Sequence, residues 1–110
     1  MAYDEELADR IRAFIGNRAG VTEQKMFGGL AFLIGGNMAV AASGQGGILV
    51  HVDPDESEAL IARTKATLEM RGRAMRGWLR VDTEHLRTKR QLGPWVERGT
   101  AYARSLPPKS

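Results

Sequence analysis

The pattern of apolar and polar positions divides the chain into helical and strand-like segments. Near the start, apolar residues recur at the three- and four-residue spacing that places side chains on one helix face: Leu7, Ile11, Phe14 and Ile15. Asp4 precedes this run and can accept hydrogen bonds from the free N–H groups at a helix start. The sequence therefore predicts a first helix that begins after Asp4 and ends in the segment 16–20.

Between residues 21 and 52 the pattern changes to short apolar runs separated by glycine, which is typical of strands. We expect four strands of an antiparallel meander, over 22–27, 30–34, 38–42 and 48–52. The glycine-rich turns at 35–37 and 44–47 supply the positive backbone angles that tight hairpins need. In the last strand Ile48, Val50 and Val52 share one face, and Leu49 and His51 lie on the other.

A second helix is predicted to start at Asp53-Pro54, with Asp53 as cap and Glu56 as its capping-box partner, and to end near Lys65. Residues 68–81 predict a hairpin that turns at Gly72 with a two-residue loop. If Gly72 and Arg73 form that loop, Glu69 lies opposite Arg76 on the neighbouring strand.

The last segment has the pattern of a helix with a second capping box, formed by Thr88 and Gln91. Its apolar stripe comprises Leu92, Trp95, Val96, Gly99, Tyr102 and Leu106. Pro94 either kinks this helix or marks its true start. The order of the elements predicts one α+β domain over residues 1–110, with an ordered core at about 4–106. We expect an antiparallel sheet, made of a meander and a later hairpin, covered on one side by about three helices.

The composition adds bounds on location and chemistry. The 110 residues contain no cysteine, so disulfides, thiol catalysis and thiolate zinc sites are excluded. No apolar run approaches a membrane span, and the start is acidic rather than signal-like, so a cytoplasmic protein without membrane contact is expected. The charge is uneven: residues 1–60 carry four basic and nine acidic side chains, and residues 61–110 carry twelve and four. Such asymmetry favours contact with a polyanion or marks a solvated basic face.

The basic half suggests a nucleic-acid surface on the hairpin. Period-two alternation places Arg76, Trp78 and Arg80 on one strand face and Met75, Gly77, Leu79 and Val81 on the other. Cations beside an exposed aromatic ring suit the phosphates and bases of a single strand. The surface could be extended by Arg71, Arg73, Arg87, Lys89 and Arg90. The alternative is that the final helix covers Trp78 beside Trp95 or Tyr102, while the arginines pair with Glu69, Asp82 and Glu84.

Several short motifs together resemble one family. The run Lys25-Met26-Phe27-Gly28-Gly29, then Phe32, the turn Gly35-Gly36-Asn37 and Met38 are similar to the TfoX N-terminal domain found in TfoX/Sxy-type regulators. The turn at 71–73, Met75 and the Trp95-Val96 helix follow in the same order. The resemblance implies an α+β domain with a central antiparallel sheet, found in regulators of natural competence and as short stand-alone proteins. We interpret Met26, Phe27, Gly28, Gly29, Gly36 and Met38 as structural, with Met26 and Phe27 in the core.

No arrangement of side chains indicates catalysis or a cofactor. The two histidines lack the i, i+4 spacing of metal ligands, and Ser43, His51 and Asp53 come without a nucleophile elbow or oxyanion loop. We therefore expect a non-enzymatic binding or regulatory module. Its candidate partners are nucleic acid, another protein, or a second copy that would use the meander edge or the Trp95 helix. A small-molecule binder or enzyme with a pocket between sheet and helices, lined by His51, Trp78 or Glu69, is the remaining alternative.

Overall fold

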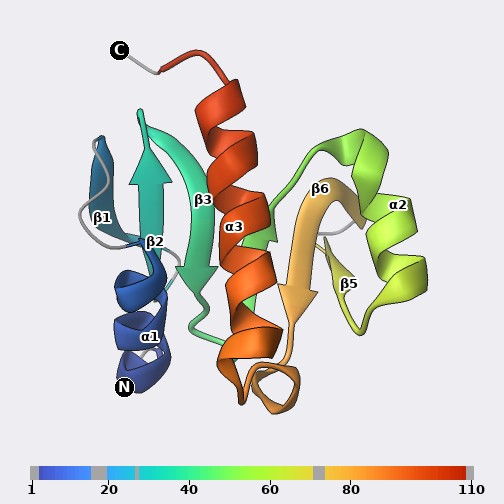
Figure 1. Ribbon diagram of the computed structural model, residues 1–110, viewed down its shortest axis with the longest axis horizontal. Coiled ribbons are helices and arrows are strands. Elements are labelled where there is room, and N and C mark those ends of the chain that lie inside the picture. The colour runs from blue at the N-terminus through green and yellow to red at the C-terminus, as the bar shows by residue number, and fades with distance from the viewer. Residues whose placement is uncertain (1–2, 16–19, 27, 71–73, 109–110) are drawn as a thin grey trace.

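The computed structural model describes residues 3–15, 20–26, 28–70 and 74–108. Its elements are, in chain order, α1 (Glu5–Ile15), β1 (Val21–Met26), β2 (Gly29–Ile34), β3 (Asn37–Ala42), β4 (Ile48–His51), α2 (Pro54–Arg63), β5 (Thr67–Met70), β6 (Ala74–Val81), a 3-10 turn η1 (Thr83–His85) and α3 (Lys89–Ser105). Figure 1 shows how they are arranged. Each helix and strand predicted from the sequence is present, with its ends shifted by a few residues. None of the helices described is long and apolar enough to cross a bilayer.

The strands form one six-stranded sheet in the order β1-β2-β3-β4-β6-β5, and all neighbours are antiparallel. The predicted α+β fold is thereby confirmed. The first four strands are the expected meander. After β4 the chain passes through α2 and enters the sheet again at its far edge as β5. The hairpin then brings β6 back beside β4, so β6 is an inner strand and β5 an edge strand.

The helix starts are fixed by the predicted caps. The Asp4 carboxylate accepts a hydrogen bond from the Leu7 N–H at 3.1 Å. At α3 the capping box is complete, because Thr88 Oγ1 accepts from the Gln91 N–H and Gln91 Oε1 accepts from the Thr88 N–H, both at 3.1 Å. These side chains satisfy N–H groups that have no partner within the helix. Local sequence therefore determines where both helices begin.

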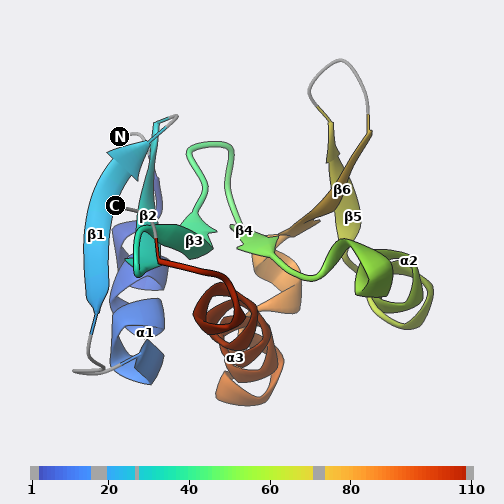
Figure 2. The same ribbon diagram turned by 90° about the horizontal axis from the view of Figure 1, so that it is seen from above.

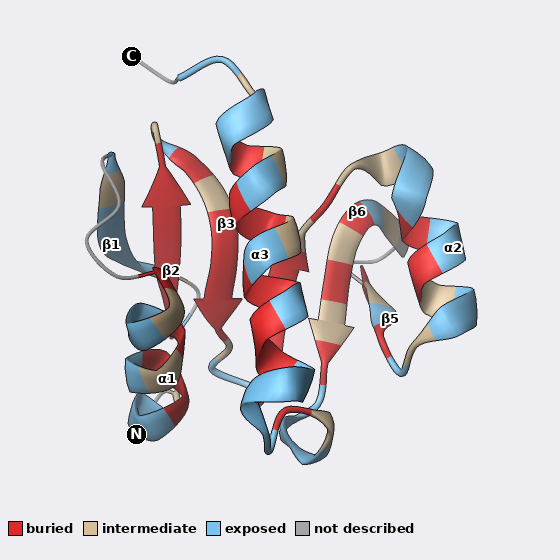
Figure 3. Cartoon of the chain, viewed as in Figure 1, coloured by how far each residue is buried: buried red, intermediate tan, exposed pale blue. Residues whose placement is uncertain are grey.

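The main core lies between one face of the sheet and the helices. Figure 3 shows the buried residues of α1 and α3 on the sides that face the strands. Fully buried members from both layers include Leu7, Ile11, Phe32, Val40, Val50, Leu79, Leu92 and Val96. Trp95 is 6% exposed and belongs to this core. The helix expected as an alternative dimer contact thus uses its tryptophan within its own domain.

Helix α3 crosses the sheet at close range. Pro94 lies inside the helix, so it does not mark the helix start. One turn and a half further on, Gly99 sits so close to β3 that a Cβ atom placed on it would be 2.3 Å from the Ala39 carbonyl oxygen. Glycine at this position allows the backbones of helix and strand to approach each other. The helix is thereby pressed against β3 and β4, the central part of the sheet.

The hairpin departs from the prediction. Met70 pairs with Ala74, so three residues, 71–73, connect the strands instead of two; these residues lie outside the described part of the chain. Glu69 pairs with Met75 and not with Arg76, while its neighbour Leu68 pairs with Leu79. Residues 76–78 are therefore extra residues on β6, which is a β-bulge.

Gly77 makes the bulge possible. Its φ angle is +87°, a backbone conformation that side chains with a Cβ rarely adopt. Its carbonyl oxygen accepts a hydrogen bond of 2.7 Å from the Val52 N–H, which extends the pairing of β6 with the end of β4. The sequence pattern predicted that Met75 and Trp78 lie on different faces of the strand. This prediction is wrong, because the bulge interrupts the alternation of side chains. Both side chains line the same pocket.

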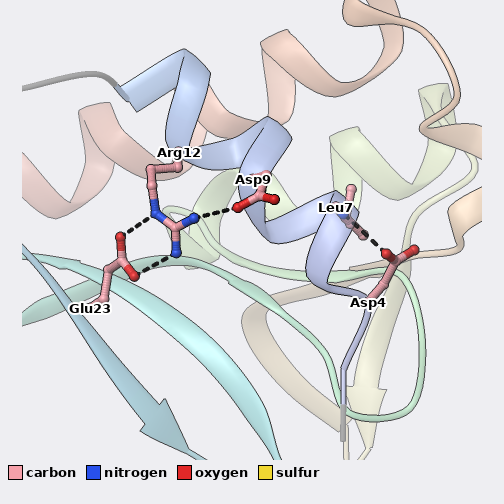
Figure 4. A network of polar contacts seen from close by, with 5 residues as sticks. All are labelled: Asp4, Leu7, Asp9, Arg12 and Glu23. Atoms are coloured by element: carbon pink, nitrogen blue, oxygen red, sulfur yellow. Dashed lines mark hydrogen bonds and ion pairs between the residues drawn. The ribbon is translucent and has the colours of Figure 1, made fainter. Parts of the chain in front are cut away.

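A polar network fastens α1 to the edge strand β1 (Figure 4). The Arg12 guanidinium donates two hydrogen bonds to the Glu23 carboxylate, from Nε at 2.7 Å and from Nη2 at 2.8 Å, and a third to Asp9. The hydrogen bonds from Arg12 lower the pKa of Glu23 below its usual range. The pair is largely exposed, so it orients the two elements more than it stabilises them.

Candidate functional site

The face of the sheet opposite the helices is concave and apolar. Figure 2 shows β1 and β2 on one side and the β5–β6 hairpin on the other, with β3 and β4 between them and the helices on the convex side. A second cluster of apolar side chains lies on the concave face: Ala31, Leu33 and Ala41 are buried, and Met26, Met38 and Leu49 pack against them. We call this surface the trough. The described helices leave it uncovered.

The trough contains a pocket of about 320 Å³. Its lining includes Met26, Leu33, Met38, Leu49, His51, Glu69, Met75 and Trp78. Ligand sites in proteins are usually apolar cavities of about 300–1,000 Å³ with a few polar groups. The pocket fits that description at its lower limit. A smaller pocket of about 190 Å³ continues the trough toward Ser43, Gln45 and Arg80 and shares Met26, Met38, Leu49 and Glu69 with the first.

An aromatic stack forms one wall of the larger pocket. His51 and Trp78 are direct neighbours across β4 and β6, and their rings stack at a centroid distance of 3.9 Å with planes 10° apart. Tyr102 of α3 meets His51 edge-on, at 5.0 Å between centroids. Trp78 is half-buried, and it is not packed beside Trp95, which lies in the core between sheet and helices. The final helix therefore contacts this wall through its Tyr102, which meets His51 of β4.

An ion pair between β5 and β6 lies on the same side of the trough as Trp78. Glu69 is 8% exposed, and its carboxylate is 3.6 Å from Arg80 Nη1. Nη2 of the same guanidinium lies 3.2 Å from Ser43 Oγ and 3.3 Å from the Gly46 carbonyl oxygen. Arg80 is therefore held inside the trough by two hydrogen bonds and one ion pair. The pairing of Arg80 with Glu69 agrees with one part of the alternative considered from the sequence.

The described residues among those proposed for nucleic-acid contact do not form one surface. Arg76 turns toward α2, where it donates to the Pro54 carbonyl oxygen at 3.1 Å and lies 3.6 Å from Asp55. Arg80 and Trp78 belong to the trough. The remaining described members, Arg87, Lys89 and Arg90, are exposed around the start of α3 on the convex side. Arg71 and Arg73 lie outside the described residues.

The motif residues near the start of the sheet have mixed roles. Met26 and Met38 line the trough, where they pack against the buried Ala31, Leu33 and Ala41 and not in the main core between sheet and helices. Gly28, with a φ angle of +76°, is in the β1–β2 turn, and Gly29 begins β2, where a Cβ atom would be 2.3 Å from the Ala42 carbonyl oxygen. Gly36 lies in the next turn and also lines the larger pocket. Phe27 lies outside the described residues.

Metal-binding geometry is not found in the described part of the chain. No group of three histidine or carboxylate side chains there could hold a metal ion. Asp53 caps α2 by accepting from the Asp55 N–H at 2.9 Å, and Ser43 Oγ contacts Arg80. The pocket lined by His51, Trp78 and Glu69 exists, but it lies on the helix-free face and not between sheet and helices, because the space between sheet and helices is filled by the core.

Sequence reasoning missed most of the trough. Alternation in β4 correctly places Leu49 and His51 away from the core, but this pattern cannot show that distant strands surround them. The contributions of Leu33, Met75 and Glu69 depend on the curvature of the sheet and on the bulge in β6. Gly77, an isolated glycine inside the strand pattern of 75–81, is a local signal of the bulge, whereas no local signal marks the curvature.

Comparison with known proteins agrees with the fold and motifs. No match to the chain was found among curated proteins or among solved structures. The family model of the TfoX N-terminal domain matches residues 14–103, which is most of the chain and includes the Met26–Gly29 motif, the trough strands and all but the last two residues of α3. This chain therefore belongs to the TfoX N-terminal domain family.

Proposed function

We propose that the protein is a non-enzymatic binding module and that the trough is its binding surface. The observation that carries this proposal is the uneven covering of the sheet: one face is packed against the helices, while the other keeps apolar side chains around an open pocket. Exposing such a surface costs free energy in water, and contiguous apolar patches on soluble domains commonly mark interaction sites.

The lining supports binding rather than catalysis. Methionine contributes three of the apolar side chains, at positions 26, 38 and 75, and its flexible thioether adapts to different shapes. The charged groups of the trough, Glu69 and Arg80, are engaged with each other and with Ser43 and Gly46. They serve to shape the wall of the site.

Photo-crosslinking tests the assignment of the surface. A photoreactive amino acid replaces Leu49 in the trough, and a control protein carries it at Ala59, which is exposed on α2. Both proteins are irradiated in cells that express them, and adducts are identified by mass. We expect a defined adduct from position 49 in cells, and the same adduct when the irradiation is repeated in a lysate at high salt, because apolar contacts tolerate salt. Adducts that are absent at 49, or the same at 49 and 59, would contradict the proposal.

Nucleic-acid binding is a second candidate, favoured by the exposure of Arg87, Lys89 and Arg90 around the start of α3. Phosphate contacts release counterions, so such binding should weaken steeply as salt rises. Binding to a mixed pool of short DNA and RNA is measured at two salt concentrations, with the protein and with a variant in which these three residues are alanine. Unchanged binding by the variant would rule out this surface.

A further inference from the structure

We infer that the larger pocket of the trough is a site for a small, uncharged aromatic molecule. This inference rests on the proposed function of the trough and names the class of its ligand. It is drawn from the volume of the pocket, the chemistry of its walls and the balance of charge along them.

The volume limits the size of the ligand. A cavity of about 320 Å³ is too small for a folded partner or a whole helix, and it matches the smaller ligands that protein pockets enclose. The pocket is also bounded on several sides by separate strands, since β1 and β2 contribute Met26 and Leu33, while β5 and β6 contribute Glu69 and Met75. A pocket that is open on one side and bounded by several strands suits a compact molecule more than an extended chain.

The walls favour an aromatic ring. Three thioethers, from Met26, Met38 and Met75, line the pocket together with the indole of Trp78. Sulfur atoms of methionine make favourable contacts with aromatic rings, often at the ring edge. Aromatic rings also pack well in offset or edge-to-face arrangements against other rings. The stack with His51 fixes the orientation of Trp78, so this wall is already formed before a ligand arrives.

The charge of the lining favours a neutral ligand. Among the described residues that line this pocket, Glu69 is the one carboxylate, and neither lysine nor arginine is present. The Glu69 charge is compensated by Arg80 from the adjoining part of the trough. A charged ligand would lose its hydration on entering the pocket without gaining an uncompensated counter-charge. An uncharged ring avoids that cost.

A pair of fluorescent probes separates these requirements. N-phenyl-1-naphthylamine is neutral and aromatic, and 8-anilinonaphthalene-1-sulfonate has the same rings with an added sulfonate. Titrated with the intact protein, the neutral probe should saturate at one molecule per chain. The sulfonate should bind at least about tenfold more weakly, since it adds a charge that the pocket cannot compensate. Equal binding of the two probes, or no binding of the neutral probe, would overturn the inference.

Variants at one trough position locate the probe. Met38→Trp places a larger side chain in the pocket and should abolish binding, whereas Met38→Leu conserves the volume and should leave the dissociation constant within about threefold. Binding that survives Met38→Trp would place the probe elsewhere and refute the assignment. If Met38→Trp does not fold, methyl NMR of the natural protein gives the answer. The probe should shift the methyl signals of Met38 and Met75 and leave those of Val50, in the core on the other face, unchanged; the reverse pattern would refute the site.

The two proposals can fail separately. If position 49 crosslinks to a protein or to a second copy of the chain while the neutral probe does not bind, the trough remains the binding surface and its occupant is a macromolecule. If position 49 gives no specific adduct and the probe does not bind, both proposals are wrong.

Discussion

The packing of α3 against the sheet makes a sharp prediction for Gly99→Ala. The added methyl group would lie 2.3 Å from the Ala39 carbonyl oxygen and 3.2 Å from Val50 Cγ1. The first contact is about 1 Å shorter than an ordinary carbon–oxygen contact, and it involves strand backbone that is held on both sides by the sheet. The helix must therefore move away from β3, which disturbs the core beneath the trough.

The magnitude follows from two opposing effects. Alanine is favoured over glycine inside a helix by about 1 kcal/mol. Overpacking of a tight core costs about 1–3 kcal/mol and can cost more where backbone must move. Because the contact at Gly99 is with backbone, we expect the upper part of that range and a net loss of about 1–2 kcal/mol in the free energy of unfolding.

Gly93→Ala in the same helix is the matched control. Its added methyl group would lie 3.0 Å from Cε1 of the half-buried Phe14 ring, which can turn aside. The gain in helix propensity should then offset the contact, so this variant should be as stable as the natural protein or slightly more stable. The assay is urea unfolding followed by circular dichroism. Gly99→Ala should lower the urea midpoint by about 1 M, and Gly93→Ala should not lower it. If Gly99→Ala is as stable as Gly93→Ala, the close approach of α3 is not a constraint.

Three further predictions concern the edge strand, a helix cap and the bulge. Glu23→Gln should cost less than about 1 kcal/mol at pH 7, because the pair is largely exposed. The folded-state pKa of Glu23 lies below its ordinary value of 4.5, so the extra stability of the natural protein over the variant should be complete above pH 4.5 and disappear as pH falls through the folded-state pKa. Urea midpoints of both proteins at neutral and acidic pH test this. A stability difference that grows in acid would contradict it. Thr88→Ala removes the capping box and should lower stability by about 1 kcal/mol, seen as a lower melting temperature, whereas Thr88→Ser should preserve it. Gly77→Ala forces a positive φ angle on alanine and brings its Cβ to 2.9 Å from the Val52 carbonyl oxygen. The variant should lose at least about 1–2 kcal/mol of unfolding free energy and bind the neutral probe more weakly. An unchanged melting temperature and unchanged probe binding would show that the pocket does not depend on the bulge.

Local signals in the sequence determined most of the secondary structure. Asp4 and the Thr88–Gln91 pair set helix starts because their side chains bind nearby N–H groups, and this requires no distant residue. Alternation along 48–52 assigned the two faces of β4 correctly, because side chains in a regular strand must alternate. The order of the elements was enough to indicate α+β, and the motif around Met26–Gly29 indicated the family.

The tertiary structure decided the binding surface. The alternation rule failed in β6 because Gly77 adopts a positive φ angle within a bulge, and that angle is held by the bond from Val52. The bulge lets Met75 and Trp78 line one pocket, and the pairing of the separate strands brings Met26 of β1 and Met38 of β3 into the same lining. These contacts join residues far apart in the chain. Sequence periodicity reports which side of its own strand a residue occupies, whereas a pocket depends on how separate strands pair, bend and face one another.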